Sequence, residues 1–208
     1  MKKILLLLLC LPMLAMAREK RDDTKYLAGA VPEVNGQVLF QQTFAVEGKT
    51  RAQIYQTMKA YITKMMGEER QLMGTKLNLD DAENGIIVGR FEEWMIFKKK
   101  PLVLDRTRFR YLLTIECHEA KCKMQLTQIS YYYEEDLEGN NGRTFRAEEW
   151  INDDNALNKA GTKLLYGSAK FRRKTCDRVE EIFTGALEAF ESPVPETVKP
   201  KAAKVIKE

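Results

Sequence analysis

The chain has 208 residues, of which 34 are basic and 30 are acidic, so its formal net charge is +4 at neutral pH. A chain of this length can bury one sizeable hydrophobic core, and we therefore expect a single domain. The near balance of charges predicts a mixed, solvated surface without the strong net positive charge typical of nucleic-acid-binding proteins, so no nucleic-acid partner is expected.

Export is predicted by the start of the chain, residues 1–17. Two lysines precede an apolar run from Ile4 to Met13, and the small residues Ala15 and Ala17 occupy the positions that a signal peptidase recognises. We expect cleavage between Ala17 and Arg18, which places the mature protein in the periplasm or outside the cell. The apolar run has about half of the ~20 residues that a membrane-spanning helix needs, so no transmembrane segment is expected after processing.

The next predicted elements follow a charged lead-in. Residues 18–36 show little apolar periodicity, and we expect this lead-in to be mobile. Residues 37–191 are expected to form the single domain, which starts with a strand at 37–46. Thr50 and Gln53 then make a Thr-x-x-Gln capping box, which marks the start of a helix. Apolar residues at helical spacing continue this helix for about four turns.

Several strands and a second helix complete the domain. Strand-like stretches at residues 75–79 and 85–97 precede the clearest strand, 107–117, in which apolar and polar side chains alternate. A final helix is expected over residues 168–190, and residues 192–208, rich in proline, lysine and alanine, are expected to be a disordered tail. The order strand, helix, several antiparallel strands, helix predicts an α+β fold, with helices packed on one face of a curved antiparallel sheet.

A β-bulge is predicted in the strand that follows residue 121. The apolar alternation resumes there at Cys122, but by Ile129 it has changed to the opposite phase. One extra residue near Thr127 or Gln128 would bring both halves of the strand onto one face.

Four segments resemble those of a known family. They are Tyr26–Val34 (YLAGAVPEV), Leu104–Arg108 (LDRTR), Tyr131–Glu135 (YYYEE) and Lys170–Thr175 (KFRRKT). Together they are similar to the exported bacterial domain-of-unknown-function family 4468, whose fold is described as like that of the TATA-box-binding protein. The resemblance implies this fold, in agreement with the predicted order of elements. It implies no activity and no functional residues, because the family has none assigned, and the name of a fold is weak evidence of function.

A structural disulfide is predicted between Cys117 and Cys122. These residues flank a four-residue loop between adjacent antiparallel strands, both in the apolar phase, and directly opposed strand residues are within disulfide range. Two alternatives remain open. One is a metal site formed by both cysteines and His118, but such a site would lack a fourth ligand. The other is a pair of reduced, buried thiols. Cys176 falls on the apolar stripe of the final helix and is expected in the core.

No catalytic residue, metal site or cofactor is predicted. His118 is the only histidine, and no serine lies in a Gly-x-Ser-x-Gly elbow. A carboxylate pair that acts as acid and base needs no histidine, so a hydrolase remains an alternative. The candidate pairs, Glu92-Glu93, Glu134-Glu135 and Glu148-Glu149, are interpreted as solvated faces.

The most suggestive surface pairs arginines with tyrosines on neighbouring strands. A register through Cys117 and Cys122 makes the arginines and some of the tyrosines cross-strand neighbours, and guanidinium groups stack on aromatic rings. The residues are Arg106, Arg108 and Arg110 on one strand and Tyr131, Tyr132 and Tyr133 on the next, with Tyr131 and Tyr133 as the favoured tyrosines. Such a surface can bind an anionic glycan, a lipid headgroup or a protein, or it can be an ordinary packed strand pair.

These observations favour a non-enzymatic envelope protein that binds an envelope protein or glycan through the uncovered sheet face or exposed loops. The alternative is a carrier of a small apolar ligand, in whose cavity Met58, Met65, Met66 and Met73 would form an adaptable lining. A carboxylate-dependent hydrolase is the third possibility. A filled core with a flat exposed sheet would support the binding module, and an apolar cavity would support the carrier.

Overall fold

The computed structural model describes residues 21–133 and 142–191. The predicted cleavage site at Ala17 and Arg18, the pair Glu134-Glu135 and the predicted tail at 192–208 lie outside these residues. The helical segments are η1 (Thr24–Tyr26), α1 (Arg51–Met66), α2 (Ala147–Trp150), α3 (Asp153–Ala156) and α4 (Tyr166–Glu191). The strands are β1 (Glu33–Val34), β2 (Gln37–Val38), β3 (Phe40–Ala45), β4 (Lys76–Asp81), β5 (Ile86–Lys100), β6 (Val103–His118), β7 (Lys121–Tyr133) and β8 (Arg143–Arg146).

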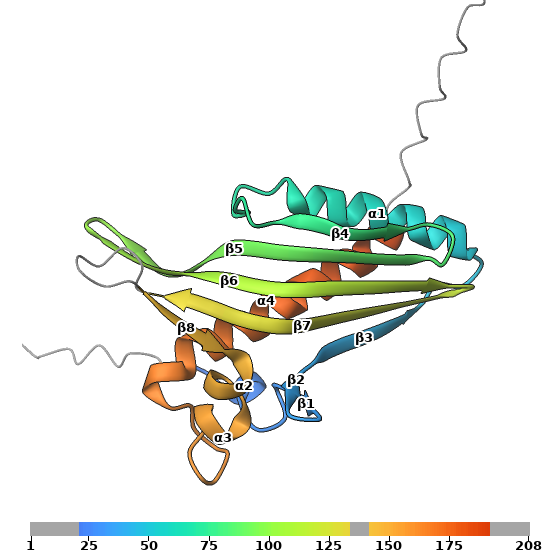
Figure 1. Ribbon diagram of the computed structural model, residues 1–208. Helices are drawn as coiled ribbons and strands as arrows, with labels where there is room; N and C mark the ends of the chain where they lie inside the picture. Colours follow the sequence, from blue (N-terminus) through green and yellow to red (C-terminus); the bar gives the residue numbers. More distant parts are fainter. Residues whose placement is uncertain (1–20, 134–141, 192–208) are drawn as a thin grey trace, which may run out of the picture.

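One large antiparallel sheet dominates the structure. Its order is β3-β7-β6-β5-β4, and β8 pairs with β7 next to β3, so that β3 and β8 share one edge of β7. The long strands β5, β6 and β7 form the centre, and β1 and β2 make a separate two-stranded sheet. Figure 1 shows α1 and α4 on the same side of the large sheet, with α4 running diagonally behind it. This arrangement confirms the predicted α+β fold with helices on one face.

The core lies between this sheet face and the two long helices. Helix α1 begins where predicted, because the Thr50 hydroxyl accepts a hydrogen bond from the Gln53 backbone N–H (3.3 Å) and the Gln53 side chain accepts one from the Thr50 backbone N–H (3.0 Å). Its apolar stripe includes Met58 and Met65, which are fully buried. Helix α4 contributes Phe171, among other residues, to the same core. None of the described helices is long and apolar enough to cross a membrane.

The predicted β-bulge is confirmed at Gln128. Arg110 pairs with Ser130 and Leu112 pairs with Thr127, so β7 carries one extra residue at this point. Gln128 has φ +53°, the left-handed conformation that a bulge residue often adopts. The extra residue returns the second half of β7 to the phase of its first half.

Residues 21–36 differ from the mobile lead-in that was predicted. Arg172 of α4 is fully buried and donates hydrogen bonds to the backbone carbonyls of Tyr26 (2.6 Å) and Leu27 (2.7 Å). It also donates to the carbonyl of Ile151 and forms an ion pair with Asp153, each at 2.6 Å. This part of the chain therefore belongs to the packed domain, because a buried guanidinium needs these acceptors.

Candidate functional site

The open face of the sheet, opposite α1 and α4, carries a cluster of arginine and aromatic side chains. We call it the arginine–aromatic cluster and define it as Trp94 of β5, Arg106, Arg108 and Arg110 of β6, and Tyr132 of β7. Trp94 is paired with Arg108, and Arg108 is paired with Tyr132, so these three residues form one row across three strands. Successive residues of a strand point to opposite faces, and the β6 residues between the arginines, Thr107 and Phe109, are buried under the helices.

The rings and guanidinium groups of the cluster lie in stacking range. The guanidinium carbon of Arg106 lies 3.6 Å from the centre of the Trp94 ring, and that of Arg108 lies 5.6 Å from the same ring. Arg108 and Arg110 lie 5.8 Å and 5.7 Å from the centre of the Tyr132 ring. The cluster is therefore assembled by contacts between its own side chains, which fix the rings and the charges in place.

Glu92 supports the cluster from the neighbouring row. Its carboxylate accepts hydrogen bonds from Nε (2.8 Å) and Nη2 (2.7 Å) of Arg110, and Nη1 of Arg108 lies 3.7 Å away. Glu92 is buried, and a Cβ on Gly74 would collide with its carboxylate. Because residue 74 is a glycine, the loop between α1 and β4 can cover Glu92. The covered carboxylate holds Arg110 in place through its two contacts.

Tyr131 and Tyr133, predicted to lie beside the arginines, are on the opposite face. Tyr131 is fully buried, its hydroxyl lies 2.6 Å from Oγ1 of Thr175, and burial raises its pKa well above the ordinary value. Tyr133 donates a hydrogen bond to Asp105 (2.9 Å) and accepts one from Lys170 (2.6 Å). The bulge explains the error, because a strand that returns to phase places residues 129, 131 and 133 with the core and leaves Tyr132 with the arginines.

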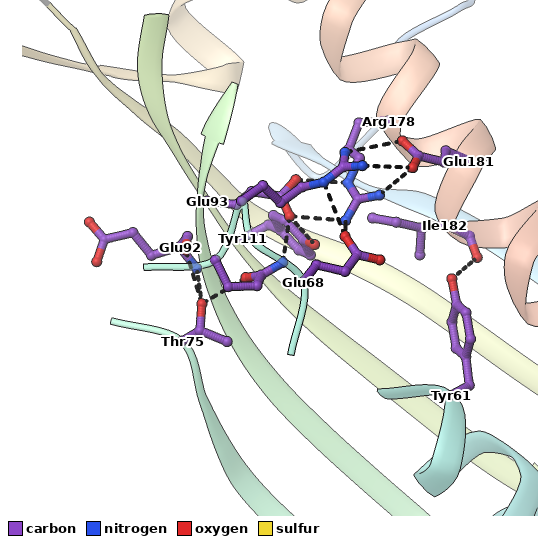
Figure 2. A network of polar contacts seen from close by, with 11 residues as sticks. Tyr61, Glu68, Thr75, Glu92, Glu93, Tyr111, Arg178, Glu181 and Ile182 are labelled. Carbon is purple, nitrogen blue, oxygen red and sulfur yellow. Dashed lines mark hydrogen bonds and ion pairs between the residues drawn. The ribbon is translucent and has the colours of Figure 1, made fainter. Parts of the chain in front are cut away.

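A buried ion pair on the helix side was not predicted. Glu93 is almost fully buried and forms a two-point ion pair with Arg178 of α4, with Oε1 2.7 Å from Nε and Oε2 3.0 Å from Nη2. Gln71 donates a further hydrogen bond to Glu93 (2.8 Å), and Arg178 also contacts Glu181 (3.0 Å). Figure 2 shows that Glu92 points away from this network. The interpretation of Glu92-Glu93 as a solvated face is wrong, because each carboxylate is buried and held by arginine on its own side of the sheet.

Two surface clefts lie beside helix α4, one at its middle and one at its start. One, of about 620 Å³, is lined by charged residues around the Glu93–Arg178 pair. The other, of about 1010 Å³, lies beside the start of α4 and is lined by aromatic rings and by basic residues. The rings are those of Tyr133, Phe145, Trp150, Tyr166 and Phe171. The methionines proposed for an apolar cavity line neither cleft. Met58 and Met65 are buried in the core, and Met73 is fully exposed.

Cys117 and Cys122 face each other directly across the β6–β7 hairpin, and both are buried. Their sulfurs are unbridged in this structure. The hydrogen bond with Cys117, together with burial, raises the pKa of the Cys122 thiol well above its ordinary value. The register is the one from which the disulfide was predicted, and the disulfide stays a prediction. Among the described residues, no group of three or more histidine, cysteine, aspartate and glutamate side chains is placed to hold a metal ion.

Comparison with known proteins places this fold in a family. Residues 40–132 match the domain of unknown function (DUF4468) with TBP-like fold. A DUF4468 family protein from Bacteroides ovatus ATCC 8483 is 40% identical, with a TM-score of 0.76 over 84% of this chain and 98% of that chain. The chain belongs to the DUF4468 family. The predicted family resemblance is confirmed, and all five residues of the arginine–aromatic cluster lie within the part of the chain that matches DUF4468.

A more distant structure supports the fold alone. A TBP-like protein from Parabacteroides distasonis ATCC 8503 has a TM-score of 0.64 at 20% identity, over 77% of this chain and 97% of that chain. No match was found among curated proteins. The DUF4468 description names a fold and no activity, so a function for this member has to be argued from its own residues.

Proposed function

We propose that this DUF4468 protein is an exported, non-enzymatic binding module, which docks a protein or glycan of the cell envelope on the open face of its sheet. The observation that carries the proposal is the row Trp94–Arg108–Tyr132, which crosses three adjacent strands on the face opposite α1 and α4. Tryptophan, tyrosine and arginine are the residues most enriched at energetically important positions of protein interfaces.

Neither cleft is lined by Arg108, Arg110 or Tyr132, and this favours a macromolecular partner for the open face. A protein or an extended glycan can lie across several strands, whereas a small molecule is normally enclosed in a concave site. Arginine presents a planar fork of donors that suits carboxylate groups on either kind of partner. The side chains of Arg108 and Arg110 remain about one-third exposed, so a partner can contact them together with the rings.

The absence of enzymatic activity is part of the proposal. The buried carboxylates Glu92 and Glu93 point to opposite faces and are each engaged by arginine, so they do not share one substrate position. His118 is half exposed at the far end of β6, where its Nε2 lies 3.9 Å from Glu116. Neither arrangement has the geometry of an acid–base pair or of a histidine-activated nucleophile.

A second candidate function, carriage of a small ligand, rests on the aromatic cleft beside the start of α4. Its volume of about 1010 Å³ is in the range of ligand-binding sites, and several of its lining residues are aromatic. Native mass spectrometry of the exported protein tests this candidate. A reproducible small-molecule adduct would favour carriage, and the bare protein would count against it.

Site-specific photo-crosslinking in living cells tests the main proposal. A photoreactive phenylalanine analogue is placed at Tyr132 on the open face and, as a control, at Leu187, an exposed apolar residue of α4 that lines neither cleft. We expect a discrete crosslinked species from position 132, which is lost when Trp94 and Arg108 are replaced by alanine and serine. Crosslinks of equal yield from both positions, or none from 132, would contradict docking on this face.

A further inference from the structure

Among the described residues, the β5–β6 hairpin extends beyond the other strands of the sheet. The last β7 residue in the described register, Tyr133, pairs with Thr107, whereas β5 and β6 continue to pair with each other as far as Lys100 and Val103. Figure 1 shows this end of the hairpin projecting past the other strands on the left. We call residues 98–104 the hairpin tip.

The hairpin tip combines exposed apolar side chains with lysines. Leu102 is fully exposed, and Val103 and Leu104 are 44% and 52% exposed. They follow Lys98, Lys99 and Lys100, which are also exposed. The tip contains three lysines and no acidic residue, so its formal charge is positive.

The conformation and exposure of the turn show that the Leu102 side chain does not stabilise the fold. Leu102 has φ +61°, a left-handed conformation that glycine and asparagine adopt readily and that is unfavourable for a bulky apolar residue. A fully exposed leucine gains no burial at this position. The lysines alone would explain protection of the strand edge against aggregation, but they do not explain Leu102, Val103 and Leu104.

The base of the hairpin is fixed to the domain, so the tip is held in a defined position. The Phe97 ring packs edge-on against Phe171 of α4, with ring centres 4.7 Å apart. Asp105 forms an ion pair with Lys170 of α4 at 2.9 Å. Phe97 lies at a register shift between Ile96 and Lys98, which is a bulge of the kind that turns a strand.

We propose that the hairpin tip inserts its apolar side chains into the surface of an anionic phospholipid membrane, while the adjacent lysines contact the headgroups. Exposed apolar residues beside basic residues are the pattern of segments that bind membrane interfaces. A protein partner fits less well, because a stable interface buries roughly 800 Å² on each side, more than a few side chains of a narrow tip can supply. A bilayer accepts such a wedge without a complementary pocket.

Vesicle co-sedimentation of residues 18–208, which include every described residue, tests the proposal. We expect binding to vesicles that contain phosphatidylglycerol, weakening at high salt, and little binding to pure phosphatidylcholine vesicles. Replacing Lys98, Lys99 and Lys100 by glutamate should lower the partition coefficient by about 100-fold or more. The control replaces three exposed lysines elsewhere, Lys49, Lys159 and Lys174, by glutamate with the same change in net charge. Equal losses for both variants, or no vesicle binding by the unmodified protein, would overturn the proposal.

Two substitutions at Leu102 separate membrane insertion from a structural role. Leu102→Gly suits the positive φ and should leave the thermal stability unchanged or raised, but it should lower the partition coefficient by about 10-fold because the apolar side chain is lost. Leu102→Trp should show a blue-shifted emission and quenching by brominated lipids when vesicles are added. Met73→Trp, at a fully exposed position in the loop between α1 and β4, is the control and should show neither. Unchanged partitioning of Leu102→Gly, or an unshifted emission of Leu102→Trp, would contradict insertion, whether or not the open face binds a partner.

Discussion

Replacing Glu93 by glutamine is expected to lower the free energy of unfolding by about 3 kcal/mol, because it leaves the Arg178 guanidinium buried beside a neutral amide. Glu93 is 2% exposed, and both of its oxygens contact Arg178. Removing one partner of a buried ion pair costs about 3–5 kcal/mol. We expect the lower end of this range because Glu181 and Glu68 still lie 3.0 Å and 3.3 Å from Arg178.

The assay is equilibrium unfolding in urea, with thermal unfolding followed by circular dichroism as a second measurement. A loss of about 3 kcal/mol corresponds to a decrease in Tm of roughly 6–12 °C for a domain of this size. Glu181→Gln is the matched control, since that side chain is 51% exposed and should cost below about 1 kcal/mol. The double variant Glu93→Leu/Arg178→Met should lie close to the unmodified protein, because it removes both buried charges. Equal costs for Glu93→Gln and Glu181→Gln would refute the assignment of Glu93–Arg178 as the central pair of the network in Figure 2.

Three further outcomes are expected. Arg172→Met should destabilise the protein by about 3 kcal/mol, because the carbonyls that Arg172 holds lose their donor, and hydrogen exchange should accelerate in residues 21–36. Arg173→Met removes a partly exposed ion pair and should cost below about 1 kcal/mol. Equal effects of the two variants would contradict the role of Arg172 in holding residues 21–36 on α4. If the protein is exported as predicted, the chain purified without reductant should have a mass two daltons lower than the reduced chain, and Cys117 and Cys122 should not label until they are reduced. Labelling of both thiols after unfolding without reductant would exclude the disulfide. Burial raises the pKa of Cys176 to about 11, so its alkylation in the native protein should stay slow at pH 9 and accelerate only as the pH approaches 11, whereas urea should make it fast at pH 9.

The parts of the fold that were predictable are those set by neighbouring residues. The Thr50–Gln53 capping box places both partners within one helical turn, and its two hydrogen bonds form as expected. The phase change in β7 indicated a bulge, which the structure places at Gln128. Both signals arise from periodicity and local hydrogen bonding, so tertiary packing has little opportunity to overrule them.

The parts that were not predictable depend on partners far away in the sequence. Glu93 becomes a buried charge only because Arg178, 85 residues later, lies beside it. The lead-in becomes part of the core because Arg172 reaches Tyr26 across 146 residues. An adjacent pair of glutamates and a charged N-terminal segment are typical of solvated chain, and nothing within either segment indicates the arginine that holds it.

The bulge at Gln128 also determines what the two faces of the sheet carry. One extra residue assigns Tyr131 to the helix side, where its ring lies 5.1 Å from that of Phe171, and leaves Tyr132 opposite Arg108 on the open side. Without that residue, the alternation of β7 would place Tyr132 against the helices and two tyrosines beside the arginines. The same irregularity therefore adds Tyr131 to the aromatic core and leaves Tyr132 on the open face, in one row with Trp94 and Arg108. The composition of the candidate site follows from this backbone feature as much as from the identity of its side chains.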